Sequence, residues 1–390
     1  MDKNNHFPFD LLSASVEEKK KYFVECTINH PKLNKAFLKV MEKVNESPDG
    51  KVFLVYGPTG VGKSTLCKKV HNEIILRYLE NAGSSKEEIP VVMLELASPD
   101  NGKFNWKDFY RRLLKEMQEP LIDKKISLKS VEKRRMPNYL PSTSPELRES
   151  LENAIYHRKT RIILLDEAQH LLKVASAKGI QDQMDALKSI ANITGSIFFM
   201  FGTYDLMEFI NLNGQLGRRT DEIHFPRYNA IDEEDQVIFK NIINTFQYHL
   251  PLDGEINILQ YWEFLYERSI GCIGILKEWL DDCLKDVLNN NAQFSLQILE
   301  KHAPSPSKAL KIAEETINGE ENIKRQGENL YLLREKLGLR SMPNKLKSEE
   351  GNEKKSKRKK KDVGKRNPTR DEIGITENGA LGKTTKIGGD

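Results

Sequence analysis

The sequence has 390 residues, 38% of them apolar and 30% charged, with a formal net charge of +4. This length allows two or three domains with a substantial core. The longest apolar runs, such as IFFMF at 197–201, are far too short to span a membrane, and MDKNNHFPFDLL does not resemble a secretory signal. The four cysteines have neither zinc-site nor disulfide-framework spacing, which favours a reducing cytosol.

The net positive charge of the chain comes from its last fifty residues. Residues 341–370 carry 12 Lys or Arg against 4 Asp or Glu, and residues 371–390 carry 2 against 4, which leaves the first 340 residues at a net charge of −2. The polar composition from about residue 341 predicts a disordered basic tail. Its charge suits nonspecific nucleic-acid binding, attachment of a partner, or solubility alone, and the sequence does not separate these.

Residues 1–50 are predicted to be an N-terminal helical segment. Leu33, Phe37, Val40 and Met41 recur at helical spacing, which predicts a helix with one apolar face. Two interpretations remain open for the preceding residues 27–31, which include His30. They are simply part of a segment packed on the core, or they lie beside an adenine ring.

The stretch KVFLVYGPTGVGKST at 51–65 predicts a strand, a tight loop and the start of a helix over 62–80. It fits the G-x-x-x-x-G-K-[ST] pattern, in which backbone N–H groups surround phosphate oxygens. Lys63 would reach the β- and γ-phosphates of ATP, and the Ser64 hydroxyl would bind Mg²⁺. The predicted nucleotide-binding residues here are Gly57, Pro58, Thr59, Gly60, Val61, Gly62, Lys63, Ser64 and Thr65.

An apolar run at 91–97 predicts a buried parallel strand, and residues 106–117 predict a helix. The irregular segment 119–145 that follows is basic and contains prolines. It is either a solvated loop or an insertion that contacts the phosphate backbone of a nucleic acid. The cations concerned are Lys124, Lys125, Lys129, Lys133, Arg134 and Arg135.

After a predicted helix at 146–158, RIILLDEAQHL at 161–171 predicts a buried strand that ends in two carboxylates. Ligands bind at the C-terminal ends of strands in open parallel sheets. Asp166 would hold Mg²⁺ and Glu167 would polarise the attacking water. The pair lies about one hundred residues after the phosphate loop with a strand between them, as an ATPase with an extra central strand requires.

A further buried strand over 196–202 ends at Thr203, which would sense the γ-phosphate or would only cap the following helix, predicted at 204–212. Arg218 and Arg219 precede a short last strand at 222–225. They would reach the nucleotide of a neighbouring subunit, or they are a solvent-exposed pair.

From residue 229 the pattern becomes helical. Helices are predicted over 231–249, 257–268 and 272–290, and a possible hairpin over 306–318 and 321–337. Lys277, in the first turn of the third helix, would contact the phosphates from a helical lid or lie on the surface.

These elements predict an α/β fold, a parallel five-stranded sheet with helices on both faces, followed by a small helical lid. The expected parts are an N-terminal segment at 1–50, a P-loop ATPase core at 51–228, the lid at 229–302, C-terminal helices at 303–340 and the tail at 341–390.

Together the motifs resemble an AAA+ ATPase, and within that superfamily the chain resembles the TniB/TnsC family of transposition regulators. The resemblance covers about Tyr22 to Leu280. The ordered set is more specific than its phosphate loop or Asp-Glu pair alone. The motifs are HPKLNKAF, GPTGVGKST, NWKDFYRRLL, LLDEAQHL, FGTYDL, QLGRRTDEIHFPRY and IGCIGILKEWL.

The resemblance implies a bacterial cytoplasmic protein that forms ATP-dependent rings or filaments of itself on double-stranded DNA and links a TniQ-type target-selection protein to a transposase, in some cases in CRISPR-associated transposons. It implies roles for Lys63, Ser64, Asp166 and Glu167 with ATP and Mg²⁺, and for Thr203 as sensor. It further implies Arg218 or Arg219 as the finger and Lys277 as lid sensor. It also points to the Lys103 region and the 119–145 insertion as DNA contacts.

Two other classes share part of this pattern. A P-loop kinase or small-molecule ATPase would need an acceptor-binding lid with a base, where this sequence has a helical lid and an arginine pair. A STAND-type signalling ATPase would normally carry a sensor or repeat domain, for which the C-terminal region is too short.

Overall fold

The computed structural model describes residues 8–81, 85, 87–99, 102–122, 143–173, 177–211, 220–252 and 257–339. The chain divides into two compact units, Met1–Gly327 and Glu328–Asp390, and the sheet, lid and candidate site belong to the first. The predicted tail at 341–390 lies outside the described residues. Among the helices that the structure describes, none combines the length and the apolar character that crossing a membrane requires.

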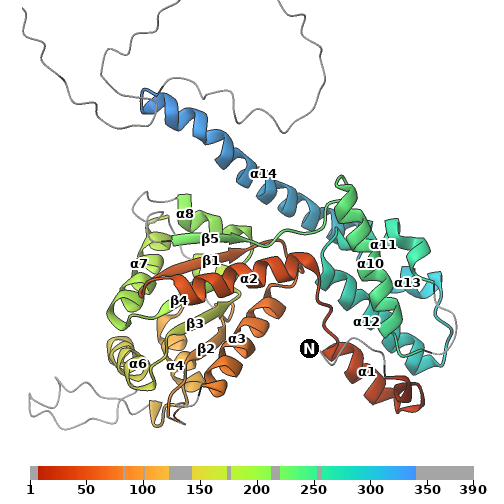
Figure 1. The fold of residues 1–390 in the computed structure, drawn as a ribbon, viewed down its shortest axis with the longest axis horizontal. Coiled ribbons are helices and arrows are strands. Elements are labelled where there is room, and N and C mark those ends of the chain that lie inside the picture. The colour runs from red at the N-terminus through yellow and green to blue at the C-terminus, as the bar shows by residue number, and fades with distance from the viewer. Residues whose placement is uncertain are drawn as a thin grey trace, which may run out of the picture. The chain divides into compact units, whose positions relative to one another are not determined.

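Five parallel strands form one sheet in the spatial order β2-β3-β4-β1-β5 (Figure 1). Strands β1 to β4 consist largely of apolar residues because both faces of the sheet are covered, whereas the edge strand β5 reads TDEIH. Since β4 separates β1 from β3, the predicted extra central strand is confirmed. The strands are β1 (Val52–Tyr56), β2 (Val91–Glu95), β3 (Ile162–Asp166), β4 (Ile197–Gly202) and β5 (Thr220–His224).

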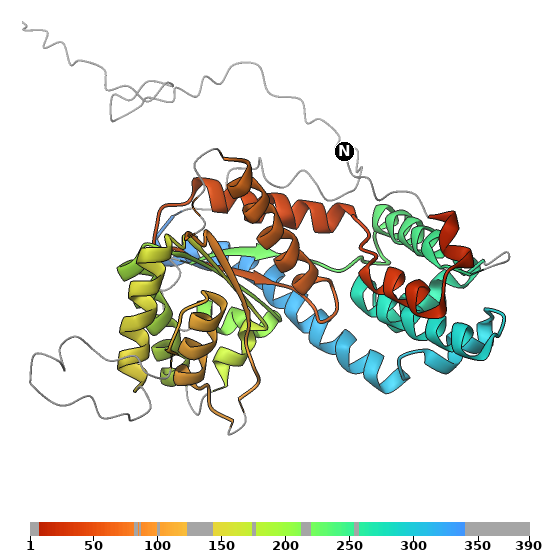
Figure 2. The same cartoon turned by 90° about the horizontal axis from the view of Figure 1, so that it is seen from below.

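Alternate strand residues point to opposite faces, so each face has its own core. Phe53 and Phe199 belong to the cluster beneath α2 and α3, whereas Leu54 and Met200 belong to the cluster beneath the helices of the other face. Figure 2 separates the two layers, with the red and orange α2 and α3 on one side of the sheet. The covering helices are α2 (Pro31–Glu46), α3 (Lys63–Glu80), α4 (Trp106–Glu116), α6 (Ser144–Arg158), α7 (Ala177–Thr194) and α8 (Glu208–Asn211).

The predicted helical lid forms a third core cluster, in which Phe239, Leu276 and Trp279 are buried. Its apolar residues recur at helical spacing on facing helices, which is why they pack into a separate bundle. The lid comprises α10 (Glu233–His249), η5 (Leu259–Tyr261), α11 (Trp262–Ser269), α12 (Ile273–Asn290) and α13 (Leu296–His302).

The N-terminal segment is shared between the lid and the sheet. After the short η1 (Phe9–Ser13), α1 (Val16–Glu25) starts at a capping box on Ser15 and buries Phe23 in the lid cluster. Helix α2 starts at Pro31, where a missing N–H costs nothing, and packs on the sheet cluster. The chain therefore crosses from lid to sheet at residues 26–30, and it crosses back at residues 225–229, between β5 and α10.

A single helix, α14 (Pro306–Lys336), replaces the hairpin predicted over 306–337. The predicted break between the two helices falls after residue 318, but Gly319 lies inside the helix. A Cβ there would meet the Tyr204 ring at 2.3 Å, so the residue allows α14 to pass close to the end of β4. Because Ile323 also packs on a sheet cluster, α14 is a third crossing between lid and sheet.

Candidate nucleotide-binding site

The loop between β1 and α3 has the conformation that a phosphate-binding loop needs. Gly60 and Gly62 have φ values of 74° and 111°, which favour glycine over other residues. At Gly57 a Cβ would lie 2.1 Å from the Phe225 carbonyl oxygen, so the loop has no space for a side chain there. The loop leads directly into the first turn of α3, where backbone N–H groups favour anions.

Lys63 is buried at this turn, with 7% of its surface exposed. Its ammonium donates hydrogen bonds to the carbonyl oxygens of Gly57, at 3.1 Å, and Pro58, at 2.7 Å. Burial lowers the pKa of Lys63, and the neighbouring carboxylates of Glu167 and Asp166 oppose that shift. The Lys63 side chain is thus held inside its own loop by the two carbonyl oxygens.

Asp166, at the end of β3, lies next to the phosphate loop because β3 and β1 both flank β4. Its carboxylate accepts a hydrogen bond from the Ser64 hydroxyl and one of 3.0 Å from the Glu167 N–H. Burial raises the pKa of Asp166, and these hydrogen bonds oppose the shift. Adjacent hydroxyl and carboxylate oxygens are ligands that Mg²⁺ prefers, so Ser64 and Asp166 fit the predicted metal.

A cavity of about 450 Å³ lies over the phosphate loop. Glu167 and Thr203 border it from the ends of β3 and β4, and Gly274 and Lys308 border it from the lid and α14. The predicted sensor Thr203 and the predicted base Glu167 thus line the same cavity as Lys63. The Thr203 hydroxyl donates to Asp205 at 2.9 Å.

A smaller pocket adjoins this cavity between the 26–30 crossing and α12. Its lining is mostly apolar, and includes Ile28, Val61, Phe246 and Ile273, with His30 at one side. An apolar pocket next to a phosphate site suits a nucleobase. Thr27, Ile28 and His30 line this pocket, and their place beside an adenine ring stays a prediction.

His30 is buried and acts as the N-cap of α2. Its Nδ1 accepts a hydrogen bond of 3.3 Å from the Leu33 N–H, so the Tyr228 hydroxyl, 2.8 Å away, donates to the same nitrogen. Burial, with Lys32 and Lys69 adding to the effect, lowers the pKa of His30 to about 4. The neutral imidazole is a structural part of the pocket wall.

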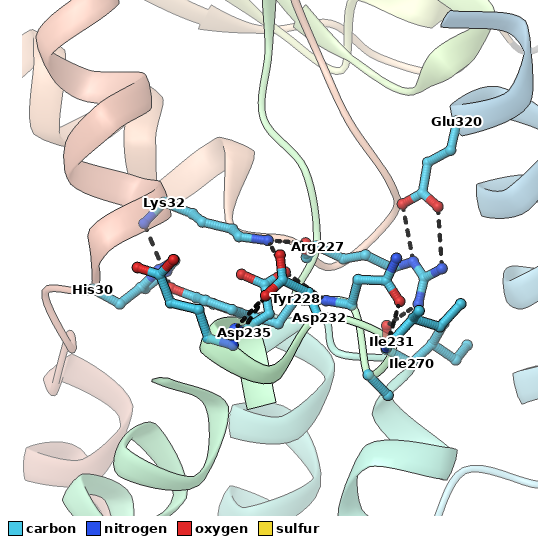
Figure 3. Close-up of polar contacts among 12 residues, drawn as sticks. His30, Lys32, Arg227, Tyr228, Ile231, Asp232, Asp235, Ile270 and Glu320 are labelled. Carbon is cyan, nitrogen blue, oxygen red and sulfur yellow. Dashed lines mark hydrogen bonds and ion pairs between the residues drawn. The ribbon is translucent and has the colours of Figure 1, made fainter. Parts of the chain in front are cut away.

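Around His30 a polar cluster, drawn in Figure 3, ties the three crossings together. Lys32 pairs with Asp235 on α10 and donates to the Arg227 carbonyl at 2.6 Å. The Arg227 guanidinium binds both carboxylate oxygens of Glu320 on α14, at 3.0 and 3.1 Å. Bidentate pairs of this kind fix orientation as well as position.

Lid and phosphate loop also touch directly. The N–H of Gly274 donates to the Gly60 carbonyl at 2.7 Å, and a Cβ at Gly274 would lie 2.5 Å from that oxygen. Ile275 packs against Gly60 so closely that a Cβ on the loop residue would meet it at 2.4 Å. The lid helix α12 therefore begins on the tip of the phosphate loop.

Lys277, one turn further, borders the smaller pocket. Its ammonium donates to the Val24 carbonyl at 2.7 Å, at the end of α1, and burial lowers the pKa of Lys277. Its predicted contact with the phosphates stays a prediction.

Other predicted residues fall elsewhere. Lys103 lies exposed in the turn before α4. The finger candidates Arg218 and Arg219 lie outside the described residues, as do six basic candidates for DNA contact, Lys124, Lys125, Lys129, Lys133, Arg134 and Arg135. Sequence reasoning missed Gln169, Arg227 and Tyr228. Gln169 lies within the LLDEAQHL motif, and this position was the signal in the sequence that could have identified it.

Residues 48–210 match a family model described as an AAA domain. This stretch contains the phosphate loop, the Asp166–Glu167 pair and strands β1 to β4 of the parallel sheet. This part of the chain is a P-loop ATPase domain of the AAA type. No curated protein matches the sequence.

Several solved structures are similar to this chain at low sequence identity. The ORC2 protein of Aeropyrum pernix is 13% identical over 72% of this chain and 70% of that chain, with a TM-score of 0.48. Cdc6p from Pyrobaculum aerophilum is 12% identical over 73% and 70%, with a TM-score of 0.49. A Walker-type ATPase of Pyrococcus abyssi is 19% identical over 76% of both chains, with a TM-score of 0.43.

The buried His30 predicts an acid-sensitive fold. Its folded-state pKa of about 4 lies below the unfolded value of about 6.5, so the unfolded chain binds more protons between these pH values and stability falls as the pH falls. We expect His30 to contribute a loss of about 2 kcal/mol in unfolding free energy between pH 7 and pH 5. Urea unfolding at both pH values measures it. The variant His30→Asn keeps a side chain able to cap α2 and should lose this part of the pH dependence; an unchanged dependence contradicts the assignment.

Proposed function

We propose that this protein is an ATPase whose binding to double-stranded DNA depends on ATP. It binds DNA without sequence preference and assembles on it as a ring or helical filament. One observation carries the nucleotide switch: the site lies where the lid meets the sheet, with the Gly274 N–H on the Gly60 carbonyl. A nucleotide bound at the phosphate loop would bear on the lid, and through it on any neighbouring subunit that contacts the lid.

The same site supports hydrolysis. Lys63 would hold the β- and γ-phosphates, and Glu167 would accept the proton of a water. The water oxygen forms a bond to the γ-phosphorus as the bridging P–O bond breaks, and the electron pair leaves with ADP. When Mg²⁺ is bound, through Ser64 and Asp166, it neutralises charge on the phosphates. Thr203 would sense the γ-phosphate.

The DNA-binding and transposition roles depend on the resemblance of the ordered motifs to TniB/TnsC proteins. Basic residues in the 119–145 insertion and the Lys103 region would contact the DNA backbone. Arg218 or Arg219 would act as a finger toward the ATP of the next subunit, with Lys277 as lid sensor. The assembly would connect a TniQ-type target-selection protein to a transposase.

The test is DNA retention and gel filtration with no nucleotide, with ADP, and with a nonhydrolysable ATP analogue. We expect assembly on duplexes of unrelated sequence only with the ATP analogue, because the analogue has a γ-phosphate group and ADP does not. Retention should fall steeply as salt rises from 50 to 200 mM, by about 10³-fold or more if six or more phosphates are contacted. A small-molecule P-loop enzyme would instead remain a monomer or dimer that is indifferent to DNA.

Assembly that is equally strong without nucleotide would contradict the proposed switch. For the transposition role, a pull-down should recover the transposase with the full chain. The same pull-down with a chain ending at Gly338 asks whether the basic tail is where that partner attaches.

A further inference from the structure

The side-chain amide of Gln169 connects the ends of β3 and β4 inside the nucleotide cavity. Its Nε2 donates a hydrogen bond of 2.6 Å to Glu167 Oε2, and its Oε1 accepts one of 3.3 Å from the Thr203 N–H. A carboxylate only accepts and a backbone N–H only donates, so the two partners fix which way the amide faces. Gln169 thus lies between the proposed base and the proposed sensor.

The backbone at Gly202 and Glu167 has the conformation that this contact requires. A Cβ on Gly202, the last residue of β4, would lie 2.6 Å from Gln169 Oε1, so a larger residue there would displace the amide. Glu167 has φ of 53°, a left-handed conformation that residues other than glycine adopt less often. This backbone starts the short η3 (Ala168–Leu172), which carries Gln169 back toward the glutamate.

The hydrogen bond restricts a carboxylate that would otherwise turn freely. A glutamate side chain has several rotamers of similar energy, and Glu167 is only partly buried. With Oε2 bound to Gln169, the other oxygen remains available for a water in the cavity. Because the amide also holds the Thr203 N–H, a shift of the β4 end would move the carboxylate with it.

We propose that Gln169 is a positioning residue for ATP hydrolysis: it orients Glu167 toward the nucleotide cavity and couples that orientation to the end of β4 at Thr203. This rests on the proposed ATPase function. Gln169 exchanges no proton and makes no contact with the reacting atoms. It acts through Glu167 alone.

The first test replaces Gln169 with alanine. We expect kcat to fall by about 10- to 100-fold, since misplacing a reacting group by about 1 Å has effects of this size. The Kd for a fluorescent ATP analogue should stay within about twofold, because the phosphate loop is unchanged. The control is Gln247→Ala, which removes a comparable contact in the lid, where Gln247 Oε1 accepts from the Ile258 N–H at 2.7 Å; its kcat should match that of the wild type.

The second variant, Gln169→Glu, keeps an acceptor for Thr203 but sets a carboxylate against Glu167. Carboxylates at positions 167 and 169, within hydrogen-bonding distance of each other, would share a proton. We expect kcat below that of Gln169→Ala at pH 7 and an ascending limb of the pH profile displaced to higher pH. A pH profile at the wild-type position would show that residue 169 does not lie against the base and would overturn the inference.

A double variant separates action through Glu167 from an independent role. In the Glu167→Gln background, adding Gln169→Ala should reduce the residual rate by less than about twofold, because the group it positions is already absent. The inference is overturned if the Gln169 variants keep the wild-type kcat, or if they lose nucleotide binding together with kcat. It is also overturned if the losses of Gln169→Ala and Glu167→Gln are fully additive. A wild-type protein that binds ATP without hydrolysing it would instead overturn the proposed ATPase function.

Discussion

Lys63→Ala is expected to weaken ATP binding by about 10- to 100-fold, the range for losing hydrogen bonds from a charged group, and with it to abolish nucleotide-dependent DNA binding. The ammonium is buried in the phosphate loop, and alanine leaves the Gly57 and Pro58 carbonyls without their donor. Titration with a fluorescent ATP analogue measures the first effect and DNA retention the second.

Lys68→Ala is the matched control, because this lysine lies on the exposed side of the same helix. It should bind ATP as the wild type does. Thermal unfolding of both variants identifies a loss caused by misfolding. Normal ATP affinity in a folded Lys63→Ala protein would contradict the assignment of the phosphate loop.

Glu167→Gln should separate binding from hydrolysis. An amide of the same shape keeps the cavity but accepts no proton from water, so we expect hydrolysis to fall by about 10²- to 10⁴-fold with ATP affinity retained. The variant should remain on DNA in the presence of ATP, since the bound nucleotide is not consumed. Phosphate release and DNA retention over time are the measurements.

The control for this prediction is Glu95→Gln. Glu95 is exposed at the end of β2 and is paired in register with Asp166, so it places a carboxylate at the end of the neighbouring strand. Its replacement should leave hydrolysis unchanged. If Glu167→Gln releases phosphate at the wild-type rate, another group is the base.

Much of the sheet was predictable because its signals are local. Strands buried on both faces are apolar runs, and the phosphate loop and Asp166–Glu167 follow two of them. The parallel strands, their order along the chain and the extra central strand could therefore be predicted from the sequence. The course of α14 could not, because the close approach of Tyr204 to Gly319 is a contact between residues more than one hundred positions apart.

The same reason limited the predictions at the site. Lys277 was placed on the correct helix, but the Val24 carbonyl that it contacts comes from α1, whose packing on the lid has no local signature. Gln169 was within a recognised motif, yet its role depends on how closely the ends of β3 and β4 approach one another. Residue identity was evident in the sequence, whereas the partners were set by tertiary packing.

The three crossings between lid and sheet restrict how the lid can move. A domain joined by one linker can swivel widely, but here residues 26–30, residues 225–229 and α14 all pass between the two parts, and Arg227 and Glu320 clamp two of them together. A rigid body attached at three points tilts by small angles and does not swing. Nucleotide exchange should therefore proceed through a small rocking movement of the lid. The lid should stay next to the phosphate loop throughout the cycle.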